Sequence, residues 1–300
     1  MPIRDLLLGV LVTFIWAANF VVVRFGLDAG LPPLLLTALR FLAVAVLIPA
    51  VPRPCGWKPL LGLGVLCGAG QMGLSTIAVA AGLSAGIASL AMQTQAFFTI
   101  GLAAVALRER PATRNVAGAA IAGVGIALLA FSRGQGSMVP VVGLVLVLAG
   151  ALSWAGGNLL LRHVGRGASP FAVAVWIAAI AALPLLCLSW ALEGSPITIL
   201  SAVRWPAMAV GVIAYTAIGS TLVATWIWAW LLARHSASLV APLSLLVPVF
   251  GMSLSAVLLH ERFGVVALLS AALVLAGLIV SLGLVSNRRI STRRQLVQRS

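Results

Sequence analysis

Ten apolar runs fill almost the whole chain and limit what it can fold into. Each run is about 17 to 25 residues long, which is the length that a helix needs to cross the hydrocarbon core of a bilayer. Only 8% of the residues are charged, whereas a soluble domain has about 25%. The sequence therefore predicts an all-α polytopic membrane protein with ten transmembrane helices. The runs cover residues 6–23, 33–50, 59–80, 84–107, 115–131, 139–161, 170–190, 206–230, 236–259 and 264–285.

The chain contains an internal duplication. Residues 85–110 and 237–262 align without a gap at an offset of 152 (237 − 85), share eight of 26 residues, and close on the same Glu-Arg pair. Each copy holds five runs. Because five is odd, the second copy is expected to cross the bilayer in the opposite direction to the first, as in inverted-repeat transporters. The predicted units are a first repeat at 1–134, a second repeat at 135–287 and a basic tail at 288–300.

The lysines and arginines predict the orientation. With the N-terminus in the cytoplasm, 14 basic residues fall in inside segments and four in outside segments, while Arg40 belongs to neither set. This asymmetry follows the positive-inside rule and predicts that both termini are cytoplasmic. The basic tail is expected to contact anionic lipid. Membrane orientation thus explains the net charge of +14, and no nucleic-acid partner is expected.

Arg40 is the only charged residue well inside a predicted span. It lies seven residues from the outer start of the second run, or about 10 Å deep at 1.5 Å per residue. A charge at such a depth is by default a functional-site hypothesis. The alternative is that Arg40 snorkels outward or braces backbone carbonyls near Asp28.

Other polar and aromatic side chains lie at a similar depth and predict a cavity, although hydrogen bonds between helices would explain any single one of them. Gln93 and Gln95 are two positions apart on a helix and therefore differ by about 200°, so only one of them is expected to face a cavity. In the matching ninth run, Pro242 and Pro248 should free backbone carbonyls near Ser244. The candidate substrate-binding residues are Trp16, Asn19, Arg40, Gln71, Ser75, Gln93, Gln95, Trp154, Tyr215 and Ser244.

The five acidic residues and the three histidines lie at the ends of runs or in loops. The usual carboxylate relay for protons is therefore missing, and the simplest mechanism is facilitated diffusion by alternating access. Protonation at Glu261 or His260 stays open as an alternative. No carboxylate pair, metal cluster or activated nucleophile occurs in the runs, so we predict no enzyme activity, no metal and no cofactor.

The motif Trp16-x-x-Asn19, and Glu109-Arg-Pro answered by Glu261-Arg-Phe, resemble the drug/metabolite transporter superfamily. The resemblance is to its proteins with two EamA domains, and in particular to the YddG-type amino-acid exporters. It implies a multi-pass protein of the bacterial inner membrane. Helices three, four, eight and nine would surround a central cavity, and helices five and ten would lie at the periphery. Phe263 in place of proline leaves the turn geometry of the second copy open.

The substrates of the family range from amino acids to drugs and sugars, and the leading hypothesis is export of amino acids, including aromatic or other apolar ones, or of similar small metabolites. Arg40 would attract or hold the carboxylate, directly or through Asn19 and Gln71. Trp16, Trp154 and Tyr215 would receive an apolar side chain. A multidrug or nucleotide-sugar carrier and a proton-coupled exporter remain alternatives. The choice between monomer and dimer also stays open.

Overall fold

The computed structural model describes residues 1–131, 140–164, 168–204 and 206–283. The predicted basic tail, 288–300, and the predicted junction between the repeats, 134/135, lie outside the described residues.

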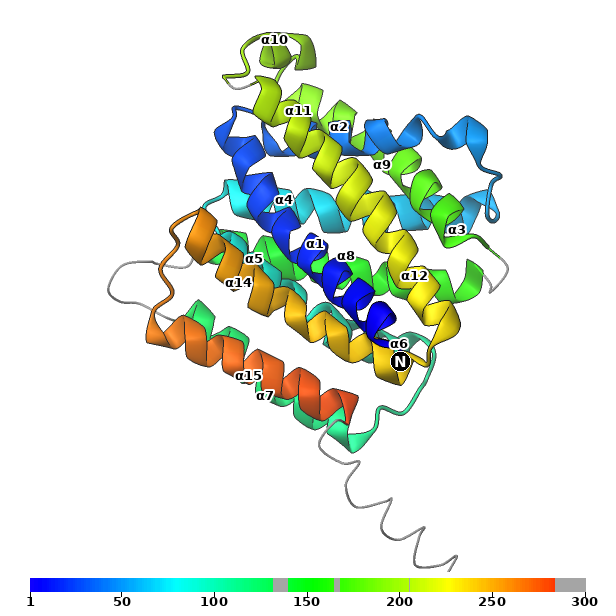
Figure 1. Ribbon diagram of the computed structural model, residues 1–300, viewed down its shortest axis with the longest axis vertical. Coiled ribbons are helices and arrows are strands. Elements are labelled where there is room, and N and C mark those ends of the chain that lie inside the picture. Colours follow the sequence, from blue (N-terminus) through cyan, green and yellow to red (C-terminus); the bar gives the residue numbers. More distant parts are fainter. Residues whose placement is uncertain (132–139, 165–167, 205, 284–300) are drawn as a thin grey trace, which may run out of the picture.

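The described residues form ten helices that are long and apolar enough to cross a bilayer, as predicted, and contain no β-strand (Figure 1). The first repeat consists of α1 (Ile3–Asp28), α2 (Pro33–Ala45) with η1 (Ile48–Ala50), α3 (Trp57–Leu63) with η2 (Gly64–Gly73) and α4 (Leu74–Ala80), α5 (Ala85–Met92) with α6 (Gln95–Ala106), and α7 (Thr113–Ala130). The second consists of α8 (Val141–Val164), α9 (Pro170–Leu192), α11 (Pro206–Ala214) with η3 (Tyr215–Val223) and α12 (Ala224–Arg234), α13 (Ala237–Val240) with η4 (Ala241–Leu245) and α14 (Leu246–Leu258), and α15 (Val265–Leu282). The short helix α10 (Pro196–Ser201) lies between α9 and α11.

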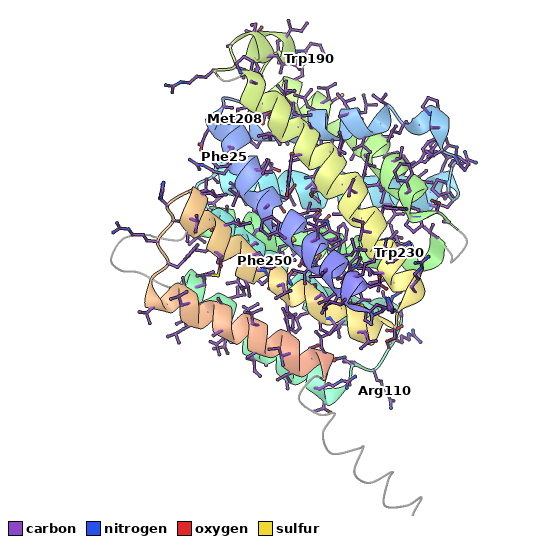
Figure 2. The ribbon with its side chains drawn as sticks, in the orientation of Figure 1. Phe25, Arg110, Trp190, Met208, Trp230 and Phe250 are labelled. Atoms are coloured by element: carbon purple, nitrogen blue, oxygen red, sulfur yellow. The ribbon has the colours of Figure 1, made fainter. Side chains whose placement is uncertain are left out.

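Successive spans run in opposite directions between two sides of the molecule. We call these the N-terminal side, where α1 begins, and the far side. In Figure 2, Arg110 and Trp230 lie toward the N-terminal side, and Phe25 and Trp190 lie toward the far side. Because each repeat has five spans, the second repeat starts on the far side and runs in the opposite sense. The charge distribution predicts that the N-terminal side is cytoplasmic.

Four spans depart from regular α-helix near the middle of the molecule. The third and eighth spans contain the π-helical segments η2 and η3 at corresponding positions, and π-helical turns are frequent at functional sites. The fourth span is interrupted at Gln93 and Thr94, between α5 and α6. The ninth span contains the 3₁₀ segment η4 before α14, and η4 includes Pro242. These irregular segments set the direction of the side chains that are described below.

Helices α7 and α15 pack side by side at one edge of the molecule (Figure 1). Their backbones come close together at Gly118 and Gly277, where a Cβ built on either glycine would collide with the carbonyl oxygen of the other. The third span also packs closely, since a Cβ on Gly64 or Gly68 would collide with side chains of α9. Small residues thus let backbones touch where lipid provides no hydrophobic driving force.

We expect Gly118→Ala to destabilise the protein by about 1–3 kcal/mol, because the new methyl group meets a backbone that cannot rotate away. The measurement is the midpoint of thermal unfolding of the purified protein in detergent. Gly123→Ala is the matched control on the same helix, since a Cβ there has no heavy atom within 4 Å. Equal midpoints for the two variants would contradict the proposed role of the α7–α15 contact.

Candidate functional site

A cavity of about 450 Å³ lies between the two repeats. Its described wall residues come from the first four spans of each repeat, and none comes from α7 or α15. The peripheral position expected for the fifth and tenth helices is therefore confirmed. The first, second, sixth and seventh spans line the cavity together with the third, fourth, eighth and ninth, and of these eight only the seventh had supplied no candidate residue.

The cavity opens toward the N-terminal side. There the wall ends at Val164 and Ala168, which are partly exposed, and at Pro170, which is exposed. Toward the far side the wall ends at Val23 and Val79, whose exposed fractions are only 4% and 1%. A molecule in the cavity would therefore reach solvent on the N-terminal side.

Arg40 in α2 is the only charged residue among the described wall residues, and only 2% of it is exposed. Its Nε donates to Thr221 Oγ1 at 2.8 Å, its Nη1 to Asn19 Oδ1 at 3.1 Å, and its Nη2 to Ser220 Oγ at 3.3 Å. All three acceptors are neutral. Of the five N–H groups of a guanidinium, two therefore have no acceptor among the described residues, so the arrangement holds a positive charge in place without neutralising it.

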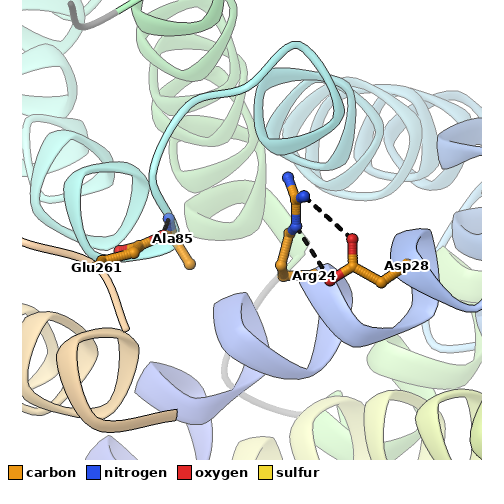
Figure 3. A network of polar contacts seen from close by, with 4 residues as sticks. All are labelled: Arg24, Asp28, Ala85 and Glu261. Atoms are coloured by element: carbon orange, nitrogen blue, oxygen red, sulfur yellow. Dashed lines mark hydrogen bonds and ion pairs between the residues drawn. The ribbon is translucent and has the colours of Figure 1, made fainter. Parts of the chain in front are cut away.

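These contacts decide between the alternatives left open for Arg40. Its side chain is buried and therefore does not snorkel outward. It does not brace the backbone near Asp28 either, because its three acceptors are side-chain oxygens. Asp28 instead pairs with Arg24 in an exposed ion pair of 3.0 Å (Figure 3).

Gln71 provides an acceptor on the same cavity wall. The residue is 7% exposed, and its Oε1 is buried with no hydrogen-bond partner in the part of the chain that the structure describes. Its Nε2 lies 3.9 Å from the sulfur of Met92, which is a weak contact. Ser75 donates to the backbone carbonyl of Gln71 at 2.7 Å and also lines the cavity. A buried amide oxygen without a donor is rare in proteins and would be satisfied by a bound ligand.

The expectation that only one of Gln93 and Gln95 faces the cavity is wrong, since both line it. The estimate of about 200° between them assumed a continuous helix. The helix is interrupted between the two residues, because α5 ends at Met92 and α6 begins at Gln95. At the interruption the N–H groups of Gln93 and Thr94 bond to carbonyls three residues earlier instead of four, which changes the angle between successive side chains.

The ninth span supplies a freed backbone carbonyl, as its prolines predicted. Pro248 has no N–H to offer to the carbonyl of Ser244, four residues earlier. Gln93 Nε2 donates to this carbonyl at 3.0 Å and so joins the fourth and ninth spans across the cavity. Ser244 also lines the cavity.

Nine of the ten candidate residues line the cavity, and Tyr215 is the exception. The Tyr215 hydroxyl donates to the backbone carbonyl of Ile15 at 2.9 Å, so the ring is directed toward α1. Counting residues from the helix end gave the depth of Tyr215 but not the face on which it lies. Trp16 and Trp154 do line the cavity.

Sequence reasoning missed Ser220 and Thr221, which bind Arg40 from the eighth span. They are adjacent hydroxyl residues near the middle of a mostly apolar run. That pattern could have identified them, had every hydroxyl at the depth of Arg40 been considered.

Known proteins resemble this chain over nearly its whole length. The model of the EamA-like transporter family matches residues 4–131 and 141–283. Proteins of Salmonella typhimurium and Escherichia coli K12, each named a probable amino-acid metabolite efflux pump, are both 38% identical over 93% of this chain and 94% of their own length. A probable terminal-alkyne amino-acid exporter of Streptantibioticus cattleyicolor is 29% identical over 95% of this chain and 94% of its own. One solved crystal structure shares the fold, with a TM-score of 0.64 and 22% identity over 96% of this chain and 99% of that one.

We expect Gln93→Leu to destabilise the fold by about 1–3 kcal/mol, because it removes the side-chain donor that bonds the partly buried Ser244 carbonyl. Gln95→Leu is the matched control, since it lies on the same wall but its side chain has no protein hydrogen bond among the described contacts. The measurement is again the thermal unfolding midpoint in detergent. If both variants lowered the midpoint equally, the hydrogen bond between the fourth and ninth spans would contribute no measurable stability.

Proposed function

The chain belongs to the EamA-like transporter family, within the drug/metabolite transporter superfamily, and is a multi-pass membrane transporter rather than an enzyme; from this premise we propose that it exports amino acids or similar small metabolites. The names of the three relatives support an amino-acid cargo. The observation that carries the proposal is the charge of Arg40, which lies on the cavity wall with neutral partners only.

The carboxylate of an amino acid would bind the two free N–H groups of Arg40. A carboxylate and a guanidinium can form two parallel charge-assisted hydrogen bonds, which are among the stronger ones in proteins. The ammonium group would donate to Gln71 Oε1, the acceptor that has no protein donor. The cavity would thus offer one charged donor and one neutral acceptor, which suits a zwitterion.

The side chain of the cargo would meet mostly apolar surface. Trp16 and Trp154 are two of the cavity residues, and Phe20, Met92 and Ile177 line the wall with them. An aromatic or aliphatic side chain would bury apolar area there. The other candidate contacts are polar groups at the edges of this surface, which are Asn19, Ser75, Gln93, Gln95 and Ser244.

The charge of the wall favours an amino acid over a nucleotide sugar. A diphosphate would bring two or more negative charges into the cavity, whereas Arg40 is the only cation among the described wall residues. An uncompensated anion is costly to hold away from water. The volume of about 450 Å³ is within the usual range for small-molecule sites, about 300–1,000 Å³.

The proposed setting is the inner membrane of a bacterium, with both termini in the cytoplasm. The bacterial sources of the relatives support the membrane, and the excess of basic residues in inside segments supports the orientation. The cavity would then take up cargo from the cytoplasm and release it outside by alternating access, without a coupling ion. The two repeats, 1–134 and 135–287, would form the opposed halves.

Arg40→Ala is expected to reduce amino-acid flux in proteoliposomes at least tenfold, the loss that follows when a charge-assisted hydrogen bond to the cargo is removed. Arg40→Lys should restore only part of it, because a lysine cannot form two parallel bonds with a carboxylate. Arg53→Ala serves as the control, since Arg53 is exposed, is not a residue of the cavity wall and lies over the ring of Trp57. Unchanged flux in a folded Arg40→Ala protein would remove Arg40 from the mechanism.

A panel of amino acids, drugs and nucleotide sugars in proteoliposomes tests the cargo class and the energy source together. We expect uptake of apolar amino acids to proceed at the same rate with and without a pH gradient. Strict dependence on the gradient would mean that transport is proton-coupled. Uptake of drugs or nucleotide sugars alone would overturn the amino-acid proposal.

A further inference from the structure

The turns that end the fourth and ninth spans have the same backbone geometry. Arg108 and His260 precede Glu109 and Glu261, and both adopt left-handed backbone angles, with φ values of 55° and 54°. Such angles are uncommon outside glycine. In both turns the glutamate N–H also bonds to the carbonyl six residues earlier, at 3.4 and 3.2 Å. The phenylalanine after the second Glu-Arg pair therefore leaves this part of the turn unchanged, and the two glutamates are presented alike.

Glu261 joins two spans by hydrogen bonds on the far side of the molecule. Its carboxylate accepts hydrogen bonds from Ser84 Oγ at 2.5 Å, from the backbone N–H of Ala85 at 2.9 Å and from that of Gly86 at 3.4 Å. Figure 3 shows Glu261 beside Ala85. These groups form the start of α5, where free N–H groups and the helix dipole favour a negative charge. The end of the ninth span is thus bound to the start of the fourth, on the side where the cavity is closed.

Glu109 is engaged differently. It pairs with Arg162 at 3.0 Å, and the two side chains are 54% and 48% exposed. An ion pair in such an exposed position contributes little stability. The pair lies on the N-terminal side, where the cavity is open. The two glutamates follow turns of the same backbone geometry but are bound differently. Glu261 accepts three hydrogen bonds on the closed side, whereas Glu109 makes one exposed ion pair on the open side.

The second repeat contains a segment that corresponds to the helix start bound by Glu261. At the offset that relates Glu109 to Glu261 (261 − 109 = 152), the segment Ser-Ala-Gly at 84–86 corresponds to Ser-Ala-Ser at 236–238. This second segment starts the helical stretch 237–258, on the same side as Glu109. The start of the ninth span therefore stands in the same relation to Glu109 as the start of the fourth span does to Glu261.

We propose that Glu261 and Glu109 are the two gate residues of the transport cycle. Glu261 holds the far side closed in the state described above. When the N-terminal side closes, Glu109 leaves Arg162 and binds Ser236 and the backbone N–H groups that follow it, while Glu261 releases Ser84. This inference rests on the alternating access of the proposed function, and it assigns a role to both glutamates that cargo binding does not require.

Two matched pairs of spin labels test the gates in proteoliposomes. The pairs are Ala81 with Val257 on the far side and Val105 with Ala233 on the N-terminal side; all four are exposed and related by the same offset. The labels are attached to cysteines in a full-length chain in which Cys55, Cys67 and Cys187 are replaced. The distance within each pair then reports whether that side is open or closed.

We expect Glu261→Gln to shift the ratio of the two states about tenfold toward the form open on the far side, as follows when hydrogen bonds to a charged acceptor are lost. Glu109→Gln should shift the ratio by a similar factor in the opposite direction, and both variants should slow transport. Arg162→Ala separates a gate from a merely structural ion pair. It should shift the ratio in the same direction as Glu261→Gln, because it removes the partner that holds Glu109 in the present state.

The gate proposal is overturned if the two glutamate variants shift the ratio in the same direction, if neither shifts it, or if Arg162→Ala reproduces Glu109→Gln. Those outcomes leave amino-acid flux through the unmodified protein unaffected, so the proposed function would stand. If the opposite shifts appear but no amino acid is transported, the gates are supported and the proposed cargo is wrong.

Discussion

A guanidinium that must remain bonded inside the bilayer fixes how three helices meet. Hydrocarbon provides no partner for a charge, so Arg40 of the second span takes acceptors from Asn19 of the first span and from Ser220 and Thr221 of the eighth. One side chain thereby links the two repeats at the cavity. Among the described residues, two of the five guanidinium N–H groups have no acceptor, and these are the groups to which the proposed cargo carboxylate would bind.

The same constraint explains where the helices are irregular. Backbone groups within a membrane must find partners inside the protein, so a broken helix is tolerated only where it is buried in protein or lines a cavity. The interruption at Gln93 and the proline-containing ninth span follow this rule, because the Gln93 side chain takes up the carbonyl that Pro248 cannot bond. The two π-helical segments lie in corresponding spans on opposite walls and contribute Gln71 and Thr221 to the cavity.

Most of the fold could be predicted from sequence, because apolar length and repeat symmetry are properties of the chain alone. The depth of polar residues was also predictable, and it placed Arg40, Gln71 and Ser75 in the correct layer. The face on which a residue lies was harder to predict, since it depends on helix irregularities. An interruption brought both Gln93 and Gln95 to the wall, and the tertiary contact with Ile15 directed Tyr215 away from it.

The neutral surroundings of Arg40 have an electrical consequence. The site carries a net charge of one positive unit whether it is empty or holds a zwitterion, because a zwitterion adds no net charge. Any displacement of this charge through the whole membrane field would involve work of about 2.3 kcal/mol per 100 mV. The membrane potential would therefore act equally on the empty and the loaded carrier, and it would favour whichever arrangement places the guanidinium nearer the negative side.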